Sequence, residues 1–187
     1  MYFVTTMTDT VRIPPERLGE EYEPLALSLA REMFERTMDG KGNYTLMITD
    51  LELDGDARMV PGDGGVYQSV KYEALMFRPV QNEIVDGEVV EVMKFGAFVR
   101  FGPLDGLVHI SQIIDDKVDI DLDNQRLMGK EKKWDLKKGD KVRGRIISIS
   151  LNQMSPRESR IGLTMRQPGL GKLEWLEEKR KEKEGDK

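Results

Sequence analysis

The residues best suited to chemistry in this 187-residue chain lie in one short stretch, at Phe95, Phe98 and His109. Two phenylalanines flank a Gly-Ala pair, and the histidine follows within the segment Leu-Val-His-Ile-Ser. Rings and neighbouring cations suit a flat, anionic ligand, because aromatic faces stack on nucleobases and cations pair with phosphates. The stretch therefore predicts a surface that binds single-stranded nucleic acid.

Short alternating segments after residue 83 predict the strands that carry these rings. The segments are 84–92, 94–101, 107–110, 141–149 and 160–166. Five strands of this length suit a small Greek-key barrel, and alternation points every second side chain outward. We expect the barrel to carry an outward aromatic and basic platform, although a single Phe is usually core and a single Arg usually solvated. Its members are Phe95, Phe98, Arg100, His109, Lys141, Arg143, Arg145 and Arg160.

His109 is the only histidine, and the chain contains no cysteine. A catalytic base and a metal ligand are alternative roles for it. A metal site needs several nitrogen or sulfur ligands, and a nucleophile needs an activating partner. The sequence offers neither, so we expect His109 to stack on a base or contact a phosphate. We expect no catalytic residue, no metal and no cofactor.

The N-terminal half has a different pattern and a different charge. Strands are predicted at 2–8, 44–53 and 66–78, and apolar residues at helical spacing predict a helix over 20–38. Residues 1–83 carry 15 acidic and 8 basic side chains, whereas residues 84–187 carry 19 acidic and 21 basic ones. We therefore expect two domains, 1–83 and 84–187, with different partners.

Three further segments are set apart by composition. A glycine-rich tip near 54–66 is either a flexible loop or a contact loop for a protein partner, and the sequence leaves both open. A long insertion at 111–138 separates the third and fourth barrel strands, and the segment 126–145 is strongly basic. The tail after Gly169 predicts a short helix that ends in a charged, solvated or disordered run.

The chain lacks the features of a membrane or secreted protein. No apolar run approaches the ~18 residues of a membrane helix, and the N-terminus resembles no secretion signal. The absence of cysteine excludes disulfides and thiolate zinc sites. We expect a soluble cytoplasmic protein with no membrane partner.

Several segments of the C-terminal half together resemble the S1-type RNA-binding domain, an OB-fold barrel. They are 87–90, 95–99, 106–111, 139–142 and 160–164. The resemblance implies ring-bearing positions at Phe95, Phe98 and His109 and a basic position at Arg160. A further position of that family, often Asp, is Ser150 here.

The N-terminal half narrows this resemblance. The segment 67–79, which leads into 82–87, is similar to the larger stalk subunit of archaeal DNA-directed RNA polymerase, the counterpart of the seventh subunit in eukaryotes. The resemblance implies an α+β, mostly β, chain with a truncated ribonucleoprotein-like α/β domain before the S1-type barrel. It also implies a heterodimer with the smaller stalk subunit and a tip that docks on the polymerase core subunits. The tip residues are Pro61, Gly62, Asp63, Gly64 and Gly65.

These observations lead to one expected function and two alternatives. We expect a non-catalytic polymerase subunit that binds nascent single-stranded RNA during initiation and elongation, with nucleotidyl transfer performed by other chains. The smaller stalk subunit is expected to meet the chain near residues 79–86. One alternative is a free-standing S1-domain protein in translation or RNA decay. The other is an enzyme that uses His109 as a base.

Overall fold

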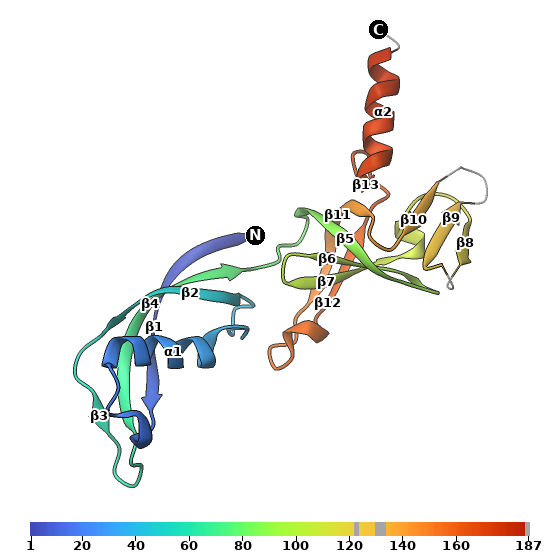
Figure 1. The fold of residues 1–187 in the computed structure, drawn as a ribbon. Helices are drawn as coiled ribbons and strands as arrows, with labels where there is room; N and C mark the ends of the chain where they lie inside the picture. Colours follow the sequence, from blue (N-terminus) through green and yellow to red (C-terminus); the bar gives the residue numbers. More distant parts are fainter. Residues whose placement is uncertain (122–123, 130–133, 186–187) are drawn as a thin grey trace. The chain divides into compact units, whose positions relative to one another are not determined.

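A computed structural model describes residues 1–121, 124–129 and 134–185 of the chain (Figure 1). The chain divides into two units, Met1–Arg78 and Pro79–Lys187. This division falls a few residues before the boundary at 83 that the sequence predicts. Residues 79–83 belong to the second unit because they bond to it: the Asn82 N–H donates to the Ile146 carbonyl (2.8 Å), and the Gln81 amide donates to the Ile147 carbonyl (2.9 Å).

The first unit is an antiparallel sheet covered on one face by a helix. Its elements are β1 (Tyr2–Ile13), a 3-10 turn η1 (Pro15–Arg17), α1 (Tyr22–Phe34), β2 (Tyr44–Leu53), β3 (Arg58–Met59) and β4 (Val66–Phe77). The strand order is β1-β4-β2, and the short β3 also pairs with β4. Leu25, Ala26 and Leu29 of α1 are buried against inward side chains of the sheet such as Ile48 and Val70. The helix thus forms because its apolar stripe has a sheet face to cover.

Two predicted boundaries in this unit differ from the structure. Strand β1 continues to Ile13, because its ladder with β4 runs on to the pair Ile13 and Val66 before Pro14 ends it. The helix predicted over 20–38 spans only Tyr22–Phe34. It ends early because Arg36 takes a left-handed conformation (φ 62°) and donates its N–H to the Thr45 carbonyl.

The second unit contains the five-stranded barrel that the sequence predicts. Its strands are β5 (Ile84–Met93), β6 (Gly96–Phe101), β7 (Leu104–His109), β11 (Lys141–Ser150) and β12 (Arg160–Thr164). They follow the order β12-β7-β6-β5-β11, and an additional pairing of β11 with β12 closes the barrel. The inward side chains Val89, Val99, Val108, Ile146 and Leu163 are buried. A mostly β chain with some helix is therefore confirmed.

The insertion at 111–138 folds into a small sheet of its own. After a 3-10 turn, η2 (Ile110–Gln112), come β8 (Val118–Asp121), β9 (Arg126–Gly129) and β10 (Asp135–Lys137) in the order β10-β9-β8. The Trp134 indole N–H donates to Asp116 (2.9 Å), and the Trp134 ring packs edge-on against Trp175. Residues 122–123 and 130–133, the latter within the predicted basic segment 126–145, lie outside the described residues.

The C-terminal tail is more regular than the sequence predicts. A 3-10 turn η3 (Pro156–Glu158) precedes β12, and β13 (Gly171–Lys172), paired with β11, leads directly into α2 (Leu173–Gly185). The helix continues through the charged run because Glu, Lys and Arg are good helix formers. Among the described residues, no helix is long and apolar enough to cross a membrane.

Candidate nucleic-acid interface

Strands β6 and β7 place the predicted rings on the outer surface of the barrel. Ala97 and Val99 are buried, so alternation turns the side chain of Phe98 outward. On β7, Leu107 pairs with Phe98, and His109 pairs with Gly96. Gly96 is required at that point because a Cβ there would collide with the Val108 carbonyl oxygen. The hairpin therefore brings its two strands close together beside the rings.

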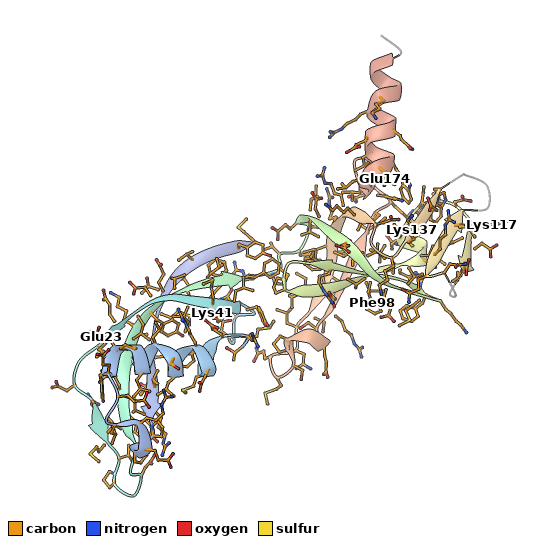
Figure 2. The ribbon with its side chains drawn as sticks, in the orientation of Figure 1. Glu23, Lys41, Phe98, Lys117, Lys137 and Glu174 are labelled. Carbon is orange, nitrogen blue, oxygen red and sulfur yellow. The ribbon has the colours of Figure 1, made fainter. Side chains whose placement is uncertain are left out.

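Phe95 and Phe98 form an edge-to-face pair. Their ring centroids are 6.3 Å apart, and the planes meet at 85°. Phe95 is 46% exposed, an unusual position for a phenylalanine, while Phe98 is half-buried on the barrel wall (Figure 2). One ring therefore supports the other, and the exposed face of Phe95 is free to stack on a ligand.

A pocket of about 490 Å³, which we call the ring pocket, lies beside this pair. It is lined by Phe95, Phe98, Asp105, Leu107, Ser148, Ser159, Arg160, Ile161 and Gly162. Leu107 and Gly162 pair in parallel register across β7 and β12 and form part of its lining. A methyl group at Gly162 would collide with Ser148 Oγ, so bare backbone lines the pocket there. The pocket thus combines a mostly apolar lining with one basic side chain, Arg160, and one acidic side chain, Asp105, which is paired with Arg100. An apolar wall beside a cation suits base stacking next to a phosphate.

Arg160 is the cation that this pocket offers. Its side chain is exposed and forms no ion pair with any described residue. In the β11–β12 ladder it pairs with Ser150. The serine leaves Arg160 without a neighbouring carboxylate at that register position. Its charge therefore remains available to an anionic ligand.

Two of the other predicted cations are already paired. Arg100 donates to Asp105 through Nε (2.8 Å) and Nη2 (3.1 Å), and Arg143 donates to Asp86 through Nε (2.6 Å) and Nη2 (2.8 Å). These hydrogen bonds raise the pKa of both guanidinium groups, and the bond from Arg143 lowers the pKa of Asp86. A paired guanidinium must exchange its carboxylate for a phosphate, so it contributes less to binding than a free one.

The three cations of β11 alternate with buried residues as predicted, but they lie over a different part of the barrel. The Nε of Arg145 is buried and has no hydrogen-bond partner among the described residues. Lys141 pairs in register with Glu88 of β5, Arg143 with Asp86 and Arg145 with Ile84. They do not line the ring pocket. The structure thus separates the predicted platform: Phe95, Phe98 and Arg160 line the ring pocket, and the three cations of β11 lie on a surface over β5 and β11. Arg100 and His109 do not line the ring pocket.

His109 is exposed at the end of β7 and bonds locally. Its Nδ1 lies 2.8 Å from Ser111 Oγ and accepts the Ser111 N–H, so it caps the turn η2. Among the described residues no hydrogen bond joins its Nε2 to an acid. A catalytic serine needs a histidine oriented by a third group, and the described residues place no such group on this pair.

A second pocket of about 440 Å³ adjoins the first and shares Phe98, Asp105 and Ser159 with it. Its lining is completed by Val90, Glu91, Arg100, Gln125 and Lys138. Gln125 and Lys138 belong to the insertion, whose fold the sequence does not predict, and so the sequence places neither at the site. The basic composition of 126–145 is the one signal that could have pointed to Lys138.

Hydrogen bonds to the Asp63 side chain fix the conformation of the predicted tip. The Asp63 carboxylate accepts bonds from Arg12 Nε (2.8 Å), Tyr67 OH (2.7 Å) and the Gly65 N–H (3.0 Å), and the hydrogen bonds from Arg12 hold the pKa of Asp63 well below its usual value. A turn closed by the Asp63 N–H and the Val60 carbonyl has Pro61 and a left-handed Gly62 (φ 91°) at its centre.

Apolar side chains lie at the exposed part of this tip. Met59 is 68% exposed and Val60 48% exposed, and Pro61 is exposed beside them. Gly64 is exposed as well, whereas Gly65 is buried. The tip is thus an ordered loop that presents apolar surface, while Asp63 serves its internal structure.

Two family models define the class of this chain, one for each unit. Residues 78–153 match the model of the S1 RNA binding domain. Residues 8–64 match the SHS2 domain found in the N terminus of Rpb7p/Rpc25p/MJ0397.

The relatives agree with this class. The DNA-directed RNA polymerase subunit Rpo7 of Saccharolobus shibatae is 39% identical over 181 residues, which cover 97% of this chain and 100% of the relative. The DNA-directed RNA polymerase II subunit RPB7 of Saccharomyces cerevisiae is 30% identical over 106 residues, 56% of this chain and 62% of that protein. The chain belongs to the Rpo7 family of DNA-directed RNA polymerase subunits.

A likeness to a solved structure is weaker. The apo form of Mycoplasma genitalium RNase R is 22% identical with a TM-score of 0.37. The match covers 44% of this chain and 13% of that chain.

Proposed function

We propose that this chain forms the stalk of a DNA-directed RNA polymerase as a heterodimer with the smaller stalk subunit, and that its barrel binds nascent single-stranded RNA in the ring pocket. The observation that carries the RNA-binding role is the exposed Phe95 ring beside an arginine that has no ion-pair partner among the described residues, Arg160. The binding site is thereby narrowed to one part of the platform that the sequence predicts.

The chemistry of this pocket suits RNA of any sequence. A base stacks on the Phe95 face, and Leu107 and Gly162 receive its edge without hydrogen bonds that would select one base. Stacking of this kind is worth about 1–3 kcal/mol per base. Arg160 pairs with a backbone phosphate, which every nucleotide carries. Such a site holds a transcript without reading it.

The remaining contacts are assigned by the same reasoning. The exposed Met59, Val60 and Pro61 of the tip dock on the polymerase core subunits, because an ordered apolar loop loses little entropy on binding. The smaller stalk subunit contacts the chain near residues 79–86. Nucleotidyl transfer is performed by other chains, and the complex works in the cytoplasm.

A stacking test examines the RNA-binding role. Phe95→Ala removes the exposed ring, and Phe95→Tyr retains one as the matched control. For a single-stranded oligonucleotide in a filter-binding titration, we expect the alanine variant to weaken binding roughly five- to 150-fold, the equivalent of one stacked base. Unchanged affinity of Phe95→Ala would sink the ring pocket as the binding site.

The alternative of a free-standing S1-domain protein makes a different prediction for the assembly. Affinity purification of the tagged full chain from its native cells should recover the polymerase core and a small stalk subunit. Recovery of ribosomes or a nuclease complex without polymerase would favour the alternative.

A further inference from the structure

The second pocket adjoins the ring pocket and is bordered by a different element. Three residues line both pockets: Phe98, Asp105 and Ser159. A single-stranded RNA that leaves the ring pocket can therefore enter the second pocket directly. Its lining also includes Gln125 and Lys138, which flank the β9–β10 pair of the inserted sheet. The insertion therefore extends the lining of the site beyond the five barrel strands.

Backbone hydrogen bonds fix these two residues against the barrel. The Lys138 N–H donates to the Gln125 carbonyl (3.3 Å), which continues the β9–β10 ladder by one pair. The next two residues form backbone hydrogen bonds with β5. The Gly139 N–H donates to the Val89 carbonyl (2.8 Å), and the Val89 N–H donates to the Asp140 carbonyl (2.9 Å). The lining of the second pocket is thus preorganised, which reduces the entropy lost when a ligand binds.

Gln125 has two unusual features at this position. Its backbone is left-handed (φ 48°), which is uncommon for a residue other than glycine. Its Oε1 is buried without a hydrogen-bond partner in the part of the chain that the structure describes. Both features cost free energy, and costs of this kind concentrate at functional sites.

The charges that line the second pocket leave Lys138 available. Asp105 is paired with Arg100, as described above. Lys138 is exposed and forms no ion pair with a described residue, and Glu91 is the remaining acid of the lining. One free ammonium group and one amide beside an aromatic ring are suited to a phosphate and to the polar edge of a nucleotide.

We propose that the inserted sheet supplies a second nucleotide position, in which Lys138 pairs with a backbone phosphate and the Gln125 amide hydrogen-bonds the nucleotide next to the one in the ring pocket. This inference rests on the proposed RNA binding of the ring pocket. It gives the insertion at 111–138 a direct part in holding RNA. It also predicts that the site is longer than the five-stranded barrel alone would provide.

The experiment compares two lysines that follow one another. Lys138→Ala removes the proposed phosphate contact, and Lys137→Ala removes an equal charge from a residue that is absent from the pocket lining. Gln125→Gly removes the amide and tolerates the left-handed backbone. Each full-length variant is titrated with uridine monophosphate by NMR and with an octauridylate by fluorescence anisotropy, the latter at several salt concentrations.

The expected result depends on RNA length. For the octanucleotide, Lys138→Ala should weaken binding roughly five- to tenfold and reduce the salt slope by about 0.7, the value for one phosphate of a single strand. Gln125→Gly should weaken it as well, and Lys137→Ala should leave the salt slope at its wild-type value. The mononucleotide, which can occupy the ring pocket alone, should bind all three variants like wild type.

Two outcomes would overturn the inference, and they are distinguishable. If Lys138→Ala and Lys137→Ala bind the octanucleotide equally while Phe95→Ala loses affinity, the second position is wrong and the ring pocket stands. If Phe95→Ala also binds normally, the proposed function fails, and the second position fails with it.

Discussion

Two arginines on the same barrel differ in whether their guanidinium group is free to bind an anionic ligand. Arg143 is held by two hydrogen bonds to Asp86, whereas Arg160 has no carboxylate partner among the described residues. The difference arises from single residues at paired positions, because Arg143 faces Asp86 and Arg160 faces Ser150. Availability of a charge is therefore decided by its cross-strand neighbour.

This contrast predicts different effects of two equal substitutions. Arg160→Gln should weaken the binding of single-stranded RNA and reduce the slope of log K against log salt by about 0.7, because one phosphate contact is lost. Arg143→Gln, the matched control, should leave that slope nearly unchanged. The measurement is a salt series of anisotropy titrations, and equal slopes for the two variants would contradict the assignment of Arg160.

At the scale of elements, the close approach of β11 and β12 shapes the ring pocket. Gly162→Ala places a methyl group against Ser148 Oγ and into the pocket lining. Overpacking of this kind costs about 1–3 kcal/mol, and the narrower pocket should bind RNA less tightly. Gly144→Ala is the control, because the nearest atom that its Cβ would meet is 3.5 Å away. Urea unfolding and RNA titration of both variants check the prediction, which fails if the two behave alike.

A buried charge cluster joins β13 and α2 to the barrel. Lys172 is only 4% exposed, and its Nζ lies 3.0 Å from Asp140 Oδ2 and 2.9 Å from Glu174 Oε2. Burial alone would lower the pKa of Lys172, but the hydrogen bonds to Glu174 and Asp140 outweigh it and raise the pKa above the usual 10.5. The protonated lysine therefore stabilises the folded chain below pH 10.5, and this contribution is lost as the pH rises through the higher folded-state pKa.

Removal of this lysine should be costly. Lys172→Met leaves the buried Asp140 carboxylate without its cation, and we expect a loss of about 3 kcal/mol, at the lower end for an orphaned buried charge. The double variant Lys172→Met, Asp140→Asn should recover most of that loss, since the Asn oxygen still accepts the Lys137 N–H. Urea unfolding at pH 7 measures both, and a double variant no more stable than the single one would refute the charge argument.

The elements also show which features could be predicted from sequence. Alternation in β6 and β11 correctly predicts the outward parity of Phe98 and Arg143, because a strand has a period of two. Alternation could not reveal that Arg143 forms an ion pair, since its partner Asp86 lies 57 residues away in sequence. The strands of the insertion contain only three or four residues each, too few for a periodic signal. Lys138 and Gln125 are missed for that reason.

At the scale of the whole molecule, the two proposed contacts lie on different units. The first unit carries an ordered apolar tip on an acidic domain, and the second unit carries the rings and the free cations. Because membership of the Rpo7 family covers nearly the full chain, both units belong to one polymerase subunit. We therefore propose that the first unit attaches the subunit to the polymerase and that the second binds RNA.

On the assembled enzyme, the proposed RNA-binding site is the ring pocket. The most direct measurement is photocrosslinking of a transcript carrying 4-thiouridine to the complete polymerase, followed by identification of the crosslinked peptides. We predict crosslinks to the β6–β7 hairpin and to the start of β12, around Phe95 and Arg160, with loss of the signal in Phe95→Ala. Crosslinks confined to the first unit, or to the β5–β11 surface around Arg143, would contradict this claim.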